Sequence, residues 1–292
     1  MRGTIIKGIA GFYEVADANG NIFTCHARGI FRKDGIKPLV GDCVLFSEAE
    51  TESSEANIEK ILPRKNELIR PSVSNIDMAV VVLSVRKPDP QLYLLDKYLV
   101  FMEQQNVPAA ILFNKTDLDT DDILPEYAAI YENIGYHILF TSAADKRGIE
   151  ELKNFISGKK VVLAGPSGVG KSSLTNILYP GARMETGEIS RKIERGKQTT
   201  RHSEFFPVGN DTFLCDTPGF TSVSLIDKEE DLRFFFPEIS VREGKCRFTG
   251  CRHLSEPGCA VKEAVQNGEI ALSRYESYKK MSEEISGKRG HI

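Results

Sequence analysis

Apolar residues in the middle of the chain form short continuous runs that alternate with stretches of helical periodicity. A continuous run suits a strand covered on both faces, and strands that alternate with helices are typical of a doubly wound parallel sheet. Such sheets bind ligands at the carboxyl ends of their strands. The apolar runs cover residues 76–85, 109–113, 137–140 and 161–164, and the helical patterns cover 91–105, 122–135 and 149–157.

The first 70 residues follow a different pattern, in which short apolar runs are separated by turn signals such as Asp17–Gly20. Four or five short strands in this length predict a small β-barrel of the oligonucleotide-binding type, and hence an RNA-binding domain. A small barrel that acts only as a spacer is the alternative. The apolar runs are residues 11–15, 21–25, 40–46 and 56–62.

The last part of the chain has helical patterns at 228–236, 260–267 and 272–285. The pattern as a whole therefore predicts a multidomain α/β protein with three parts. These are an RNA-binding barrel over 1–70, a doubly wound, mostly parallel domain over 71–225, and a helical domain over 226–292.

Composition adds few restrictions. The 292 residues are 41% hydrophobic and 27% charged, which is ordinary for a globular protein. No apolar stretch approaches the roughly 18 residues of a membrane span, so we expect a cytoplasmic protein without membrane contact. Cys25, Cys43 and Cys215 lie in apolar strand-like segments and are expected to be small buried hydrophobes.

The formal net charge is −3, but the charge is unevenly distributed. Residues 159–205 hold nine Lys and Arg against four Asp and Glu, a surplus of five, while 71–158 hold seven against thirteen. Part of the basic block must serve the phosphate-binding loop that lies within it. The block is compatible with an RNA surface and does not by itself establish one.

The phosphate-binding loop is the segment Gly165-Pro-Ser-Gly-Val-Gly-Lys-Ser172, which follows an apolar run and opens the helical pattern 171–179. Its backbone N–H groups are predicted to cradle the β-phosphate, Lys171 to bridge the β- and γ-phosphates, and Ser172 to ligate Mg²⁺. The predicted phosphate-binding residues are Gly165, Pro166, Ser167, Gly168, Val169, Gly170, Lys171, Ser172 and Ser173.

A second phosphate-sensing motif, Asp216-Thr-Pro-Gly219, ends the apolar strand 212–215. Asp216 is predicted to hold Mg²⁺ through water, and the Gly219 N–H to reach the γ-phosphate. The segment 187–203 between the two motifs lacks an apolar period and is predicted to be a switch. Its Thr199 or Thr200 is the candidate Mg²⁺ ligand; a disordered basic loop is the alternative interpretation, and the two are compatible.

A guanine-binding motif, Asn114-Lys115-Thr116-Asp117, follows the strand 109–113. The Asp117 carboxylate can accept both the N1–H and N2–H₂ donors of guanine, which adenine cannot offer, so GTP is favoured over ATP. Asn114 and Lys115 are expected to brace the loop. The segment Thr141-Ser142-Ala143 after the next strand is expected to present a backbone N–H to the guanine O6.

The order of these motifs is informative. The guanine motif stands upstream of the phosphate loop, whereas ordinary GTPases carry the two in the opposite order. The sequence therefore predicts a circularly permuted GTPase.

The C-terminal part contains Cys246-x₄-Cys251-x-His253-x₅-Cys259. Three thiolates and one imidazole match a closed tetrahedral zinc site. No acidic general base stands beside a spare ligand position, so the predicted zinc is structural.

Taken together, the permuted order, the phosphate loop, Asp216–Gly219, the Gly-x-x-Thr-Thr switch and the cysteine–histidine spacing resemble the RsgA (YjeQ/YloQ) family of bacterial ribosome-associated GTPases over essentially the whole chain. The resemblance implies a GTPase that acts late in maturation of the small ribosomal subunit, binds its rRNA and is stimulated by the subunit. It implies Zn²⁺ and Mg²⁺ as cofactors. Family members often have His before the Thr-Thr pair, where this chain has Gln198, and His202 follows the pair.

Two other classes of function remain open from the residues alone. One is a P-loop kinase or ATPase with a structural zinc, which competition of GTP binding by excess ATP would reveal. The other is a nucleotide-stabilised RNA-binding module with little turnover, which turnover measured with and without ribosomal subunits would reveal. In each case the chain is expected to act as a monomer.

Overall fold

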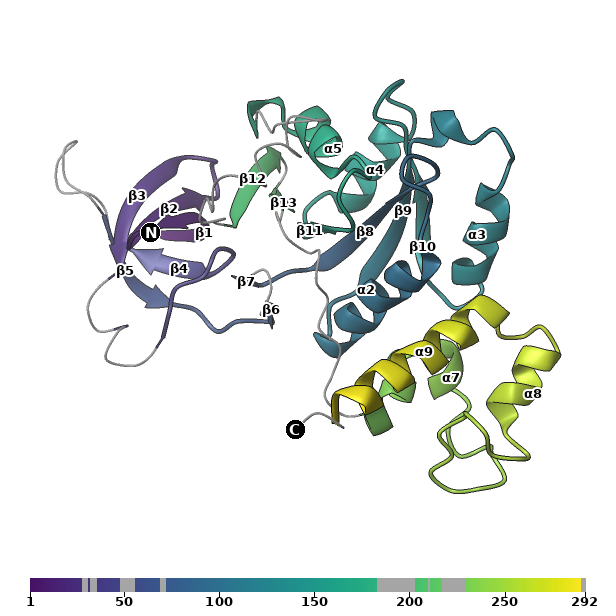
Figure 1. Ribbon diagram of the computed structural model, residues 1–292. Helices are drawn as coiled ribbons and strands as arrows, with labels where there is room; N and C mark the ends of the chain where they lie inside the picture. Colours follow the sequence, from purple (N-terminus) through teal and green to yellow (C-terminus); the bar gives the residue numbers. More distant parts are fainter. Residues whose placement is uncertain are drawn as a thin grey trace.

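One sheet of eleven strands runs from an N-terminal barrel into an α/β domain, and a helical domain packs below that α/β domain (Figure 1). The structure is a computed structural model that describes residues 1–27, 31, 36–47, 56–68, 72–182, 203–209, 211–216 and 229–289. None of the helices within these ranges combines the length and apolar character of a membrane-spanning segment.

The barrel consists of five strands and is closed by the pairing of its first strand with its fourth. This confirms the predicted barrel of the oligonucleotide-binding type. The sequence pattern did not predict the first strand of the barrel, because Lys7 and Gly8 interrupt its apolar residues. The strands are β1 (Arg2–Ile9), β2 (Phe12–Asp17), β3 (Ile22–Ala27), β4 (Cys43–Phe46) and β5 (Ala56–Ile61).

The α/β domain contains five parallel strands and one antiparallel strand, in the order β10-β9-β8-β11-β13-β12. The doubly wound, mostly parallel sheet is therefore as predicted. The strands are β8 (Met78–Ser84), β9 (Ala109–Asn114), β10 (His137–Phe140), β11 (Lys160–Ala164), β12 (Glu204–Gly209) and β13 (Thr212–Asp216).

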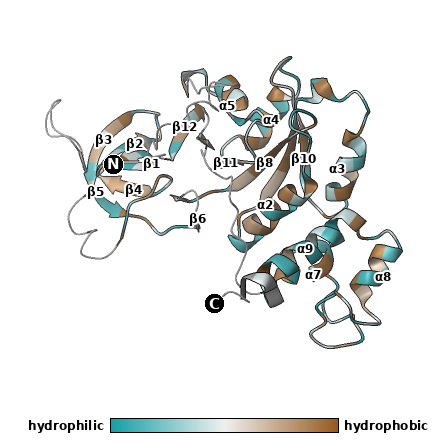
Figure 2. Cartoon of the chain, in the orientation of Figure 1, coloured by the Kyte–Doolittle hydropathy of each residue, from teal (hydrophilic) through white to brown (hydrophobic). Residues whose placement is uncertain are grey.

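Helices cover both faces of this sheet, as the apolar runs require. Alternate residues of the fully buried β8 show the arrangement: Val81 packs in the cluster that contains α2 and α3, and Val80 packs in the cluster that contains α4 and α5. The strands are accordingly hydrophobic along their length (Figure 2). The helices are α2 (Leu92–Gln104), α3 (Leu124–Glu132), α4 (Ile149–Ile156), α5 (Lys171–Leu178) and the short 3₁₀ turns η1 (Thr116–Leu118) and η2 (Pro180–Ala182).

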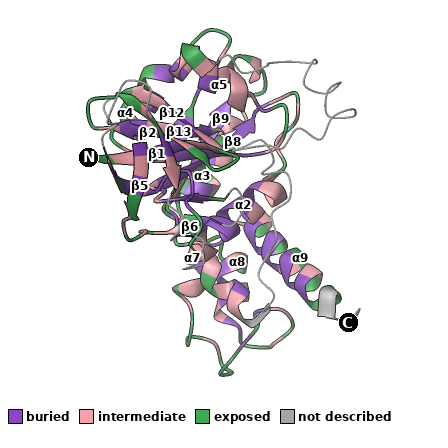
Figure 3. Cartoon of the chain, turned by 90° about the vertical axis from the view of Figure 1, so that its left-hand side faces the viewer, coloured by how far each residue is buried: buried purple, intermediate pink, exposed green. Residues whose placement is uncertain are grey.

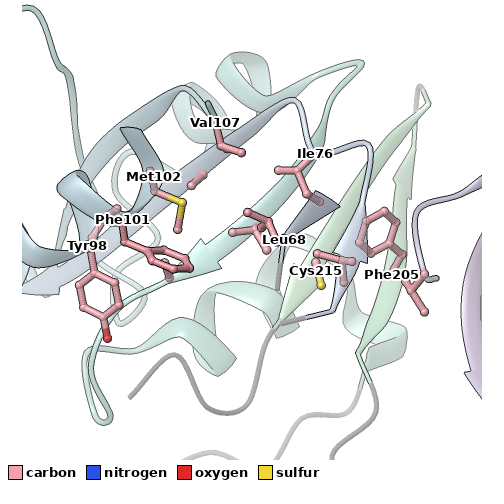
Figure 4. Close-up of a cluster of buried hydrophobic side chains, with 14 of the residues drawn as sticks. Leu68, Ile76, Tyr98, Phe101, Met102, Val107, Phe205 and Cys215 are labelled. Carbon is pink, nitrogen blue, oxygen red and sulfur yellow. The ribbon is translucent and has the colours of Figure 1, made fainter. Parts of the chain in front are cut away.

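The first of these clusters extends from α2 across the sheet to β12 and β13 (Figure 4). It brings Tyr98 and Met102 of α2 into the same buried group as Phe205 and Cys215. It also includes Leu68 from the small hairpin of β6 (Glu67–Leu68) and β7 (Val73–Ser74), which connects the barrel to the sheet. The same cluster continues into the barrel core, so barrel and sheet share buried apolar surface.

The barrel is attached to the sheet through the antiparallel strand β12, which the sequence pattern did not single out. The β1 strand pairs with β12 at Lys7 and Glu204. A second attachment is the fully buried Asp42 carboxylate, which accepts hydrogen bonds from Arg64 at 2.7 Å and from the Ser74 hydroxyl at 2.6 Å. Barrel and α/β domain are thus joined by backbone pairing and by buried polar contacts.

The C-terminal domain packs along α2 through its longest helix, α9 (Figure 1). The segment expected to be helical over 228–236 forms instead the 3₁₀ turn η3, followed by a short α-helix. Much of α2 and the facing side of α9 are buried (Figure 3). The elements are η3 (Glu229–Phe235), α7 (Pro237–Ser240), α8 (Ala260–Gln266) and α9 (Leu272–Arg289).

Buried charges hold this domain in place. The Arg274 guanidinium of α9 donates to Asp96 of α2 at 2.6 Å and to Glu238 of α7 at 2.7 Å, and all three side chains are at least 95% buried. Burial acts to lower the pKa of Arg274, but the two carboxylates outweigh burial and raise that pKa. Tyr131 of α3 donates to the same Asp96 carboxylate at 2.9 Å. The joint between the domains is therefore a specific polar network within an apolar interface.

Candidate nucleotide site and metal cluster

The phosphate loop leaves β11 through Gly165 and enters α5 through Gly170. Gly165 has a φ of 137°, and a Cβ there would lie 2.2 Å from the Val82 carbonyl oxygen. Gly170 has a φ of 98°, and its Cβ would lie 2.3 Å from the Asn114 amide nitrogen. Both positions require glycine. The first turn of α5 carries no acidic residue, so the positive end of its dipole is available to an anion.

Lys171 lies folded over this loop. Its Nζ donates to the carbonyl oxygens of Gly165 and Pro166 at 2.9 and 2.8 Å. A cation held at the mouth of a loop of N–H groups is suited to bind the terminal phosphates of a nucleotide. Ser172 and Ser173 follow in the first turn of α5.

Asn114, the last residue of β9, connects three loops. Its buried side chain donates to the Val169 carbonyl oxygen of the phosphate loop at 2.8 Å. Its Oδ1 accepts hydrogen bonds from the Thr141 hydroxyl at 3.1 Å and from the Ala143 N–H at 3.3 Å. The structure thus brings three segments into direct contact: the predicted guanine motif, the segment 141–143 that is predicted to face the guanine O6, and the phosphate loop.

Lys115 adopts a left-handed backbone conformation with a φ of 62°. Its Nζ donates to the Gly168 carbonyl oxygen at 2.6 Å and also to the Lys87 carbonyl oxygen. The loop after β8 is therefore part of the site, although nothing in its sequence indicated this. A backbone carbonyl can be supplied by any residue type, so no residue pattern could have identified Lys87.

Asp117 is exposed at the guanine end of the site, in η1. Its Oδ1 accepts a 2.6 Å hydrogen bond from the buried Ser142 hydroxyl. Ser142 in turn accepts a 3.3 Å hydrogen bond from the Asp145 N–H. Thr116 is anchored by its backbone N–H, which donates to the Thr141 carbonyl oxygen at 3.2 Å. The Asp117 carboxylate is therefore oriented by its own protein contacts before a base binds.

The strand that ends at Asp216 lies next to the strand that leads into the phosphate loop. Asp216 pairs in register with Leu163, two residues before Gly165. This places the Asp216 backbone beside the loop, as a role toward Mg²⁺ requires. The predicted residues Thr199, Thr200 and Gly219 lie outside the described residues, as does the Asp216 side chain.

The four predicted zinc ligands come together in the C-terminal domain. One ligand atom from each of Cys246, Cys251, His253 and Cys259 lies within 4.8 Å of all the others. The Sγ atoms of Cys246 and Cys259 are 3.9 Å apart, and the His253 Nδ1 lies 3.5 and 3.4 Å from them. Tetrahedral zinc with its usual bond lengths requires separations of about 3.8 Å between sulfurs and about 3.6 Å from nitrogen to sulfur.

The surroundings of the cluster also suit a metal ion. Burial lowers the pKa of His253, which favours the neutral imidazole that metals bind. The His253 Nε2, on the far side of the ring, has no hydrogen-bond partner among the described residues and lies 4.0 Å from a Glu243 carboxylate oxygen, too far for a hydrogen bond. The residues therefore fit a Cys₃His metal site.

In the comparison with known proteins, two family models match consecutive parts of the chain. Residues 61–226 match the model of the RsgA GTPase family, and residues 2–57 match that of the RsgA N-terminal domain. Two curated relatives are both described as small ribosomal subunit biogenesis GTPase RsgA. The protein from Agathobacter rectalis is 50% identical and that from Alkaliphilus metalliredigens 45% identical, with 99% of each chain covered in both cases.

Solved structures agree. YloQ, described as a circularly permuted GTPase, is 39% identical with a TM-score of 0.82, covering 98% of this chain and 95% of that one. YjeQ from Thermotoga maritima is 38% identical with a TM-score of 0.83, covering 98% of both chains. The reversed order of the motifs, their meeting in one site and these full-length similarities have one explanation: the chain belongs to the RsgA family of circularly permuted GTPases.

Proposed function

We propose that the protein hydrolyses GTP to GDP and phosphate and acts as a late assembly factor of the small ribosomal subunit. The observation that carries the proposal is the hydrogen bond from Asn114 to Val169, which joins the guanine-reading loop to the phosphate loop. This contact between residues 55 positions apart supports a single nucleotide site built from two motifs in reversed order. The curated relatives, named as biogenesis GTPases, support the biological role.

Within this site we assign catalytic roles along the phosphates. Lys171 would neutralise the charge that develops on them, and the Ser172 hydroxyl and Thr199 or Thr200 would hold Mg²⁺. Asp216 would hold Mg²⁺ through water, and the Gly219 N–H would contact the γ-phosphate. When bound, Mg²⁺ would supply charge neutralisation. The register of Asp216 beside Leu163 supports this arrangement.

We assign zinc to the Cys₃His cluster, in a structural role. Its sulfur-rich donor set and its separations near those of tetrahedral zinc support this choice. We further propose the division of the chain into a barrel over 1–70, a GTPase domain over 71–225 and a zinc domain over 226–292. We place the protein in the cytoplasm, where small subunits are assembled, as a monomer whose barrel contacts rRNA.

A base-specificity switch tests the nucleotide assignment. Asp117→Asn replaces an acceptor with an amide, which can donate to the O2 of xanthine but clashes with the N2–H₂ donor of guanine. GTP affinity should fall on the order of 10³-fold, and xanthosine triphosphate should become the better substrate. Asp122→Asn, at an exposed carboxylate nearby, is the control. If Asp117→Asn still prefers GTP, or if ATP competes equally with GTP in the wild type, the assignment is wrong.

The dependence on the ribosome has its own test. Phe220 follows Asp216-x-x-Gly219, where many GTPases carry a water-orienting glutamine, and a phenyl ring cannot orient water. Phe220 lies outside the described residues. We therefore expect slow hydrolysis by the isolated protein and stimulation of roughly 10³–10⁵-fold when small subunits supply the missing group. Rapid turnover that is unchanged by purified small subunits would contradict this expectation.

A further inference from the structure

Three cysteines lie outside the metal cluster, and Cys43 differs from the other two. Cys25 and Cys215 are fully buried, as their apolar segments predict, and burial raises the pKa of the Cys25 thiol to about 11. Cys43, at the start of β4, is only half-buried. Its sulfur accepts a hydrogen bond from the Lys160 Nζ, 3.5 Å away. A sulfur and a nitrogen, both able to act as nucleophiles, are therefore in contact at a position that is not sealed from solvent.

The two side chains belong to different domains. Cys43 lies in the barrel, and Lys160 is the first residue of β11, a central strand of the GTPase sheet (Figure 1). The residues are 117 positions apart in the sequence. The β11 strand ends directly before the phosphate loop, which begins at Gly165. The contact therefore spans the junction between the barrel and the strand that leads to the nucleotide site.

The backbone on each side of this contact is fixed. Cys43 pairs in register with Thr4, and its carbonyl oxygen accepts a hydrogen bond from the Leu62 N–H at 2.8 Å. The Lys160 N–H donates to the Asp77 carboxylate at 2.9 Å, and the Lys160 carbonyl oxygen accepts from the Asp77 N–H at 2.9 Å. The sulfur and the base of the lysine side chain are thus positioned by strand pairing, and only the flexible lysine stem has to move to close the remaining distance.

Neutral acceptors hold the Lys160 ammonium group beside the sulfur. Its Nζ also donates to the Gly41 carbonyl oxygen at 3.1 Å. Among the described residues, no carboxylate forms an ion pair with this ammonium group, because the Asp77 carboxylate pairs with Lys65 at 3.2 Å instead. No ion pair therefore has to be broken when this nitrogen forms a new bond.

We propose that Cys43 and Lys160 form an oxidative cross-linking site, at which a peroxide joins the Cys43 sulfur to the Lys160 nitrogen. Cysteine sulfenic acids condense with neighbouring nitrogen atoms to give sulfenamides. The proposal goes beyond the GTPase activity and does not depend on it. It assigns to the junction between barrel and sheet a reversible covalent bond, in addition to the pairing of β1 with β12 and the buried contacts of Asp42.

The chemistry takes place in two steps. In the first, the Cys43 thiol and hydrogen peroxide give the sulfenic acid and water; the O–O bond breaks, the sulfur loses two electrons and the peroxide gains them. In the second, the Lys160 nitrogen, having released one proton to solvent, attacks the sulfur with its lone pair. The S–N bond forms, the S–O bond breaks, and the hydroxide that leaves takes a second proton from the nitrogen to become water. Two equivalents of a thiol reductant reverse the product to thiol and amine, and are themselves oxidised to a disulfide.

The first test treats the full-length, zinc-loaded protein with a small excess of hydrogen peroxide, digests it without reductant and identifies the peptides by mass spectrometry. We expect the peptide that contains Cys43 to be joined to the peptide that contains Lys160, with two hydrogens fewer than their sum, and dithiothreitol should separate them. A joined pair that retains one oxygen between sulfur and nitrogen, formed with a second peroxide, would also support the site. The peptide with the buried Cys25 is the internal control and should stay unmodified.

Two outcomes of this experiment would overturn the proposal. One is that Cys43 remains a thiol after the exposed thiols of the protein have reacted. The other is that Cys43 is oxidised to the sulfinic acid while Lys160 stays unmodified. A joined pair in which Cys43 is linked to a residue other than Lys160 would count against it in the same way.

The second test uses matched lysine variants. Lys160→Arg keeps a cation and a hydrogen-bond donor, but a guanidinium does not give up its protons in proteins and cannot attack the sulfur. The cross-link should be absent from this variant, and dimedone should trap the Cys43 sulfenic acid instead. Lys159→Arg changes the adjacent residue, whose Nζ contacts the Phe155 carbonyl oxygen, and should form the cross-link as the wild type does. Equal yields from both variants would overturn the proposal.

Zinc content and GTP turnover of the reduced proteins are measured alongside. Cys43→Ser and Lys160→Arg should keep both, because neither residue is a metal ligand or part of the nucleotide site. Absence of the cross-link would then leave the GTPase assignment intact. Absence of GTP turnover in the reduced wild type, with subunits present, would instead contradict the proposed function and leave the cross-linking site unaffected.

Discussion

Lys7 of the barrel donates a 2.9 Å hydrogen bond to Glu204 at the start of β12. This ion pair stands where the barrel sheet and the GTPase sheet become continuous. Glu204 also marks the point at which the chain enters the sheet after the predicted switch over 187–203. The barrel is therefore paired with β12, the strand that directly follows the predicted switch in the sequence.

We predict that this ion pair contributes only modestly to stability. The Glu204 side chain is 36% exposed, and solvent screens pairs of this kind, so a double-mutant cycle of Lys7→Gln and Glu204→Gln should give about 0.2–1 kcal/mol. The hydrogen bond to Glu204 raises the pKa of Lys7, so the contribution is fully present below the unfolded-state pKa and is lost as the pH rises through the folded-state value. Urea unfolding measures it. A coupling above about 2 kcal/mol would show that the pair is more shielded than its exposure indicates.

Arg274→Met should be far more damaging. The substitution leaves the buried carboxylates of Asp96 and Glu238 facing each other without their cation, and breaking a buried ion pair typically costs about 3–5 kcal/mol. Thermal unfolding should show the loss. Glu276→Gln, at an exposed position on the same helix, is the control and should change stability by less than about 0.5 kcal/mol. Equal effects from both substitutions would mean that the network contributes little.

Removal of zinc should unfold residues 244–258 and their surroundings while the nucleotide site persists. The ligands of the Cys₃His site need a cation to remain buried as thiolates, and burial raises the pKa of Cys251 to about 12. Cys259→Ser should therefore lose the metal and expose the C-terminal domain to protease, yet still bind GTP. Elemental analysis that finds less than half an equivalent of zinc in the freshly purified wild type would argue against this prediction.

Ser142→Ala should weaken GTP binding about 10- to 100-fold. The Ser142 hydroxyl donates a 2.6 Å hydrogen bond to the Asp117 carboxylate, and hydrogen bonds to charged groups are worth about 1.5–3 kcal/mol. The measurement is the Kd for GTP and for GDP, and both should change because the contact lies at the base. Ser157→Ala, at the exposed end of α4, provides the comparison. An unchanged Kd for both nucleotides would show that Asp117 does not need this support.

The sequence predicted the central sheet because buried strands such as β8 are apolar without interruption, and it predicted the order of the motifs because each motif is local. It did not predict β12 or β1. Both strands combine apolar and charged residues: β1 pairs mainly with β2, β12 pairs mainly with β13, and the two meet each other only at Lys7 and Glu204. Lys7 and Gly8 interrupt the apolar residues of β1, and Pro207 and Gly209 interrupt those of β12, so neither segment carries a clear periodic signal.

The contacts within the site show the same limit. The sequence predicted that Asn114 and the phosphate loop belong to one nucleotide site, but not that the Asn114 side chain binds the Val169 carbonyl oxygen. The buried network around Arg274 was also missed. An arginine on a helix with charged faces normally indicates solvent, and only the fold shows that Asp96 interrupts the apolar face of α2 at the same place.

The bond between Asp96 and Arg274 spans 178 residues, which sets the order in which the protein can be completed. Chains are synthesised from the N-terminus, so α2 and its carboxylate are available long before α9 exists. Until then the face of α2 that carries Asp96 and Val100 has no cover. This face of α2 is therefore covered only when the last helix arrives, after all the nucleotide-binding motifs of the chain have already been made.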